Sequence, residues 1–124
     1  MTLAEGLYGD AVLSQLSQTL RERRSADPAG SYTARLFADG PDAILKKIGE
    51  EAAELIIAGK AGAHKDIVWE AADVLFHLTA LLAFYGLSAD DVLQEIHRRE
   101  GTSGLAVKKA REKAHGRHVE EERK

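Results

Sequence analysis

Five carboxylates in two short motifs are the residues of this chain whose types and spacing are best suited to chemistry. The motif GEEAAE contains Glu50, Glu51 and Glu54. The motif EAAD contains Glu70 and Asp73. Residues three or four positions apart share one face of a helix, so each motif directs its acids to one side. Oxygen ligands from facing helices commonly hold hard cations such as Mg²⁺, so one interpretation is a metal site between two helices.

Ion pairing is the other interpretation of these acids. Lys46 and Lys47 lie one helical turn before Glu50 and Glu51, so an exposed face of salt bridges accounts for the first motif. The second motif lies between Ile67 and Tyr85, where fifteen of nineteen residues are apolar. Two carboxylates on such a helix cost on the order of several kcal/mol unless cations meet them. Those cations can be basic side chains or a divalent metal ion, and the residues alone leave both open.

The bulk composition describes a globular protein and excludes several kinds of site. The 124 residues are 44% hydrophobic and 30% charged, which predicts one soluble domain with a sizeable core. A net charge of -3 argues against nucleic-acid binding. The absence of cysteine excludes disulfides, thiolate zinc sites and a cysteine nucleophile. No signal peptide is recognisable, and acids interrupt the most apolar segment, so we expect a cytoplasmic protein that does not bind a membrane.

Helical patterns account for most of the chain, and strand patterns are nearly absent. Helices are expected over residues 10–24, 41–60, 65–85 and 89–100. A short helix or turn is expected over residues 32–38. Asp10, Ser31 and Ser88 are the expected N-caps. The charged tail from about residue 107 is expected to fray. The predicted fold class is all-α, a single domain over residues 1–124 built as an antiparallel bundle of four to five helices.

The apolar segment over residues 65–85 predicts both burial and self-association. A helix that is apolar on nearly every side belongs in the core of a bundle. Four helices of this length cover such a helix incompletely, so a symmetric homodimer is the expected completion. His77 lies on the side of the acids and is expected to be a hydrogen-bonded residue behind the ligands.

Five segments, in order along the chain, resemble known proteins: SYTARLFADG, AILKKIGEEAAE, EAADVLFH, GLSADDVLQEI and RREGTSG. The acidic motifs match the E-E-x-x-E … E-x-x-D signature of the MazG-like all-α nucleotide pyrophosphohydrolases. KKIGEEAAE together with RREGTSG resembles, more narrowly, the phosphoribosyl-ATP pyrophosphohydrolase family of histidine biosynthesis. The resemblance extends roughly from Leu13 to Lys109.

This resemblance implies a reaction and a cofactor. The implied reaction is Mg²⁺-dependent hydrolysis of 1-(5-phosphoribosyl)-ATP to 1-(5-phosphoribosyl)-AMP and pyrophosphate. The chain has no room for the cyclohydrolase domain that is fused to this enzyme in some organisms, so we expect the stand-alone form. The family is dimeric or larger, in agreement with the dimer expected from the apolar helix.

The resemblance also implies roles for the acids. Glu51, Glu54, Glu70 and Asp73 correspond to metal ligands. Glu50 is implied as a further ligand, as a residue behind the ligands, or as the base that orients water. Glu50, Glu51 and Glu54 form the catalytic set, and the identity of the base among the acids stays open.

Substrate contacts are implied for a set of small, aromatic and cationic residues: Ser31, Tyr32, Lys47, Arg98, Arg99, Ser103 and Gly104. Each of them has a simpler alternative. Lys47 contacts a phosphate or pairs with Glu51. RREGTSG binds phosphate through backbone N–H groups and arginine charge, or is a plain helix end. Ser31 and Tyr32 contact substrate, or serve as a cap and a packing aromatic.

Two other functions fit part of the pattern. A related house-cleaning pyrophosphohydrolase that removes non-standard (d)NTPs would share the acidic motifs but has no reason to carry RREGTSG or SYTARLF. A non-catalytic helical interaction module would pair its acids with lysine and arginine side chains.

Overall fold

The computed structural model describes residues 9–101 and 104–122, and within these ranges the secondary structure is helical, without strands. The helices are α1 (Asp10–Arg23), the short 3₁₀ helix η1 (Pro28–Gly30), α2 (Tyr32–Ala38), α3 (Pro41–Ala61), α4 (His64–Phe84), α5 (Ala89–Arg99) and α6 (Gly104–Glu122). The all-α class predicted from the sequence is confirmed. The chain divides within α5 into two compact units. The first unit ends at Asp91, and the second begins at Val92.

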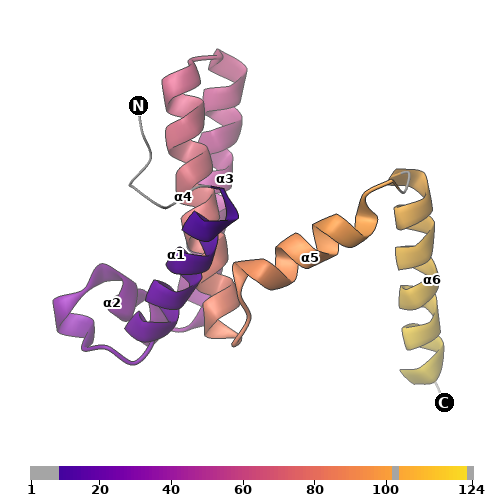
Figure 1. Ribbon diagram of the computed structural model, residues 1–124, viewed down its shortest axis with the longest axis horizontal. Coiled ribbons are helices and arrows are strands. Elements are labelled where there is room, and N and C mark those ends of the chain that lie inside the picture. Colours follow the sequence, from indigo (N-terminus) through magenta and orange to yellow (C-terminus); the bar gives the residue numbers. More distant parts are fainter. Residues whose placement is uncertain (1–8, 102–103, 123–124) are drawn as a thin grey trace. The chain divides into compact units, whose positions relative to one another are not determined.

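A long helical hairpin, α3 followed by α4, forms the frame of the first unit (Figure 1). Each helix has 21 residues and is therefore about 30 Å long. Pro41 occupies the first turn of α3, where its missing N–H is not needed. Gly62 ends α3 in the left-handed conformation, with φ of 82°, and its N–H donates to the carbonyl of Ala58. Because Gly62 and Ala63 alone connect the helices, α3 and α4 run antiparallel along each other.

The core lies at the end of the hairpin opposite this turn, where α1 and α2 pack on α3 and α4 (Figure 1). Leu20 of α1, Ile44 of α3 and Ala80 of α4 are almost fully buried. Leu36 and Phe37 of α2 complete the cluster. The packed core at the open end of the hairpin therefore holds α3 and α4 together and helps to position the residues midway along them.

Side-chain caps begin two of the helices as predicted. Ser31 Oγ accepts a hydrogen bond from the Ala34 N–H at the start of α2, at 3.3 Å. The Ser88 N–H donates to Asp91 Oδ2 at 2.9 Å in the capping box of α5. The predicted N-cap Asp10 is wrong by one residue, because Gly9 turns the chain into α1 with a positive φ of 55°.

The half of the hairpin next to its turn is uncovered in this chain. Ile56 and Ile57 near the end of α3 are 72% and 69% exposed. Val68 and Trp69 near the start of α4 are each 68% exposed. The first half of α4 is therefore left incompletely covered within one chain, as expected for helices of this length, because α1 and α2 do not reach it. By length and composition alone α4 could also cross a membrane, and 22% of its most apolar stretch is buried.

The second unit contains the rest of α5 and α6. α6 is helical in the segment for which the sequence predicts fraying. Its first half is rich in alanine, lysine, arginine and glutamate, which have high helix propensity, although its described side chains are exposed.

Candidate active site

Three acids from the two long helices meet midway along the hairpin. Glu51, Glu70 and Asp73 each offer one carboxylate oxygen, and these oxygens lie within 4.8 Å of one another. Their meeting follows from the short connection, since Glu51 lies eleven residues before Gly62 and Asp73 ten residues after Ala63. Oxygens on opposite sides of a Mg²⁺ ion are about 4.2 Å apart, so this spacing suits one hard cation after small adjustments.

The acid cluster is short of positive charge. Glu51 Oε2 and Glu70 Oε2 are buried, and neither has a hydrogen-bond partner within the described ranges. Burial, proton sharing with Glu54, and the charges of Glu54, Glu51 and Asp73 raise the pKa of Glu70 to about 7. Burial and the neighbouring Glu54 likewise raise the pKa of Glu51. A divalent cation would partner the unsatisfied oxygens and remove the repulsion, so the residues fit such an ion.

Glu54, the fourth predicted ligand, is exposed and is not one of the three acids whose oxygens meet, although it neighbours Glu51 and Glu70. A hydrogen bond between Glu54 and Glu51 or Glu70 requires that one carboxyl of the pair carries a proton, because an ionised carboxylate can only accept. Among the residues whose side chains the structure describes, no lysine or arginine forms an ion pair with any of the four acids Glu51, Glu54, Glu70 and Asp73. The ion-pair interpretation therefore fails for these four.

Glu50 differs from its neighbours because it has cationic partners. Its carboxylate lies 3.5 Å from Lys47 Nζ and 4.0 Å from Lys46 Nζ. The pKa of Lys47 is raised by Tyr32 and then by Glu50, so this ammonium stays protonated at neutral pH. Glu50 is thus the one acid of the two motifs with ion-pair partners among the described side chains, and its role at the site stays a prediction.

A hydrogen-bonded histidine links the acid cluster to α2. His77 is buried, 6% exposed, and its Nδ1 lies 2.8 Å from the backbone carbonyl of Asp73. A carbonyl only accepts, so Nδ1 carries a proton, and Nε2 lies within hydrogen-bond distance of the Tyr32 hydroxyl, at 3.2 Å. His77 therefore holds the exposed Tyr32 side chain against the hairpin beside Lys47.

Comparison with known proteins decides the family. The family model of phosphoribosyl-ATP pyrophosphohydrolase matches residues 13–100. A phosphoribosyl-ATP pyrophosphatase of Dechloromonas aromatica is 61% identical over 100 residues, which are 81% of this chain and 93% of that protein. The corresponding protein of Rhizorhabdus wittichii is 55% identical over 101 residues, 82% of this chain and 95% of its own. The chain belongs to the phosphoribosyl-ATP pyrophosphohydrolase family. A further phosphoribosyl-ATP pyrophosphatase, from Neisseria gonorrhoeae, is 50% identical over 103 residues, 83% of this chain and 96% of its own.

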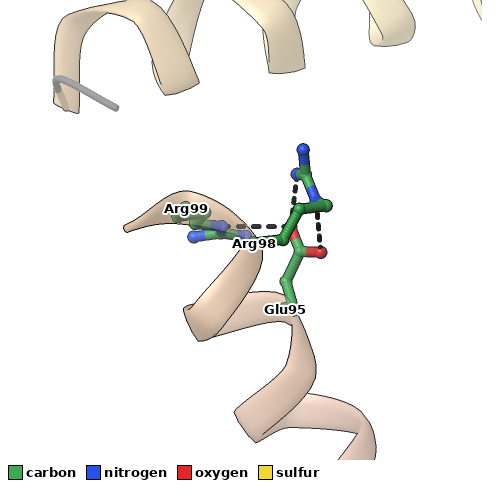
Figure 2. A network of polar contacts seen from close by, with 3 residues as sticks. All are labelled: Glu95, Arg98 and Arg99. Atoms are coloured by element: carbon green, nitrogen blue, oxygen red, sulfur yellow. Dashed lines mark hydrogen bonds and ion pairs between the residues drawn. The ribbon is translucent and has the colours of Figure 1, made fainter. Parts of the chain in front are cut away.

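The RREGTSG motif of this family member lies in the second unit. Arg98 Nε and Nη2 donate to the two carboxylate oxygens of Glu95 at 2.8 and 2.6 Å, and Arg99 Nε donates to Oε1 at 3.0 Å (Figure 2). These hydrogen bonds lower the pKa of Glu95 to about 2. Gly104 begins α6, whereas Ser103 lies outside the described residues. Substrate binding by these four motif residues stays a prediction.

Two features of this family member were not expected from the sequence. Arg35 and Asp39 line a cavity between α2 and α3 together with Tyr32, Lys47 and Glu50. The position of Arg35 one helical turn after Tyr32 was the available signal.

The other unexpected feature is a mostly apolar hollow of about 590 Å³ lined by Val68, Trp69 and Ala72, which also reaches Asp73 of the acid cluster. The exposed apolar surface beside the hairpin turn thus extends to the candidate active site.

Proposed function

We propose that this chain hydrolyses 1-(5-phosphoribosyl)-ATP to 1-(5-phosphoribosyl)-AMP and pyrophosphate in histidine biosynthesis. The observation that carries the proposal is the acid cluster of Glu51, Glu70 and Asp73, which has no cationic side-chain partner within the described ranges. Such a cluster suits the metal-assisted cleavage of a phosphoanhydride. The relatives compared above are named phosphoribosyl-ATP pyrophosphatases, which supports this substrate.

We further propose Mg²⁺ as the metal, held by Glu51, Glu70 and Asp73 with Glu54 beside them. The donors are all carboxylate oxygens, and Mg²⁺ prefers a few such ligands together with water and substrate phosphates. When bound, the ion neutralises phosphate charge and lowers the pKa of coordinated water.

The protein's own contribution is to position groups and accept a proton. The products require water to add across the anhydride between the α- and β-phosphates, with release of pyrophosphate and a proton. Glu54 is our candidate for the proton acceptor, because it is exposed and close enough to share a proton with Glu51 and Glu70. Glu50 is a less suitable candidate, because its carboxylate lies within ion-pair distance of both Lys46 and Lys47.

A homodimer is the proposed assembly. Ile56, Ile57, Val68 and Trp69 are exposed apolar residues on both helices beside the hairpin turn, and exposed apolar surface commonly marks interfaces. A second copy of the same hairpin would cover it in a four-helix arrangement and bury the exposed half of α4. We propose a cytoplasmic dimer, and we expect it to bind neither membrane nor nucleic acid. Light scattering should give a dimer mass for the wild type and a monomer mass for Ile57→Lys.

A direct assay tests the function. The purified protein is incubated with Mg²⁺ and either phosphoribosyl-ATP or a panel of dNTPs, and pyrophosphate release is measured. We expect hydrolysis of phosphoribosyl-ATP, its loss in Glu54→Gln, and no loss in the control Glu22→Gln, an exposed carboxylate of α1. Faster turnover of dNTPs would instead indicate the house-cleaning activity, and no turnover of any nucleotide would indicate a non-catalytic module.

A further inference from the structure

The structure contains a second polar site, a cavity of about 250 Å³ between α2 and α3. Arg35, Lys46 and Lys47 contribute three cations to its lining, against the two carboxylates of Asp39 and Glu50. Cavities for whole drug-sized ligands occupy roughly 300–1,000 Å³, so this one suits a smaller group. Its size and excess of positive charge suit one anionic group.

Arg35 is the cation of this cavity that the protein leaves without a counter-ion. Lys46 and Lys47 are both within ion-pair distance of Glu50. Arg35 makes no ion pair or side-chain hydrogen bond with any residue in the part of the chain that the structure describes. The guanidinium group presents several N–H donors in a plane, a geometry that matches phosphate oxygens.

Hydrogen bonds and adjacent residues of α3 connect the cavity to the acid cluster. Tyr32 forms part of its wall, and the hydroxyl of Tyr32 is hydrogen-bonded to His77, whose ring contacts the backbone of Asp73. Along α3, Glu50 of the cavity lining directly precedes Glu51 of the acid cluster. The cavity and the acid cluster are therefore joined by Tyr32 and His77 on α2 and α4 and by adjacent residues of α3.

We propose that this cavity binds one phosphate group of the substrate, remote from the anhydride that is cleaved, with Arg35 as its main contact. The proposal rests on the proposed function for its substrate, which carries a triphosphate and a separate phosphate on the phosphoribosyl group. Both sources present the same phosphate chemistry. The cavity holds either the end of the departing pyrophosphate or the phosphate of the phosphoribosyl group.

Direct binding tests the cavity independently of catalysis. Calorimetry with inorganic pyrophosphate and with ribose 5-phosphate is carried out in EDTA, where the metal-free acid cluster repels anions. We expect one probe to bind the wild type and to bind Arg35→Gln roughly tenfold or more weakly, since a hydrogen bond to a charged group is lost. Stronger binding of pyrophosphate identifies the departing group, and stronger binding of ribose 5-phosphate identifies the phosphoribosyl phosphate.

Arg21→Gln is the matched control, because Arg21 is an exposed arginine of α1 outside the cavity lining. It should bind the probe as the wild type does, and Arg35→Lys should recover part of the lost affinity. Arg35 is exposed, so unfolding should not obscure the result, and thermal melting verifies this. The proposal is overturned if neither probe binds the wild type at millimolar concentration, or if Arg35→Gln binds as tightly as the wild type.

Activity measurements separate this inference from the proposed function. If the wild type hydrolyses phosphoribosyl-ATP, kcat/KM should fall in Arg35→Gln by a factor similar to the loss in probe affinity. If the wild type does not hydrolyse it while calorimetry still shows Arg35-dependent binding, the proposed substrate is wrong and the phosphate site stands. An unchanged kcat/KM in Arg35→Gln would place the phosphate site outside the catalytic cycle and overturn the proposal.

Discussion

Glu70 provides a quantitative prediction, because one carboxyl group affects both metal affinity and the stability of the metal-free protein. Its pKa is raised to about 7 by burial, by proton sharing with Glu54 and by the surrounding carboxylates. A ligand must lose its proton to bind a metal ion, so the apparent affinity depends on the ionised fraction of Glu70. That fraction rises from about one-eleventh at pH 6 to about ten-elevenths at pH 8, so apparent Mg²⁺ affinity should increase about tenfold.

The same shift predicts how stability depends on pH. A carboxyl with a higher pKa in the folded than in the unfolded state is more often protonated when folded. Metal-free protein should therefore lose stability as pH rises from about 4.5, the ordinary value for glutamate, to about 7, the value for folded Glu70. Glu51 has a pKa raised in the same direction and adds to this loss.

The perturbation is Glu70→Gln, which retains the shape of the side chain and removes its titration. In EDTA, the variant should melt higher than the wild type at about pH 8 and show a shallower fall in Tm between about pH 5 and pH 8. Calorimetric titration with Mg²⁺ should show weaker binding, with less of the pH dependence and less proton release than in the wild type.

Glu22→Gln serves as the control because Glu22 is an exposed carboxylate outside the acid cluster. It should match the wild type in Tm, in Mg²⁺ affinity and in pH dependence. A lower Tm of metal-free Glu70→Gln at about pH 8, or a Mg²⁺ affinity equal to that of the wild type over the whole pH range, would contradict this role of Glu70.

Three further predictions concern the packing that holds the site. Leu20→Ala should lower the free energy of unfolding by about 2–5 kcal/mol in urea denaturation, because Leu20 is almost fully buried in the core, and a loss below 1 kcal/mol would contradict this packing. Tyr32→Phe should cost about 1 kcal/mol through loss of the hydrogen bond to His77, and unchanged stability would indicate that the bond contributes nothing. Ser17→Ala should cost about 1–3 kcal/mol, because the buried N–H of Ala89 loses its acceptor, and a Tm equal to that of the wild type would indicate a replacement acceptor.

Local sequence patterns predicted the helices well, because their signals lie within a few residues of one another. Pro41 and Ser31 mark helix starts by local backbone chemistry, and both predictions are confirmed. The start of α1 was misplaced by one residue, because Gly9 uses a positive φ instead of a side-chain cap. Fraying was expected in the segment that forms α6, because its charged sequence has little apolar face, whereas the structure is helical there, as the high helix propensity of its residues allows.

The acidic motifs were recognisable in the sequence, but the partners of each acid were not. Helical spacing puts Glu50 and Glu51 in one sector, and the two nonetheless have different environments. Glu50 pairs with Lys46 and Lys47, while Glu51 is left without a cationic side chain in the described ranges. A rotation of about 100° between adjacent helical residues separates an exposed position from one that faces α4.

The helices and the two faces that carry the acidic pairs follow from residue order alone, because 3.6-residue periodicity is a local property of the backbone. The meeting of Glu51 with Glu70 and Asp73 does not follow from residue order, because that contact depends on the antiparallel register of α3 and α4. Tertiary packing also decides that Arg35 lines a cavity beside Lys47, and that the apolar surface near Trp69 stays exposed. Both depend on how far α1 and α2 reach along the hairpin, and chain packing sets that reach.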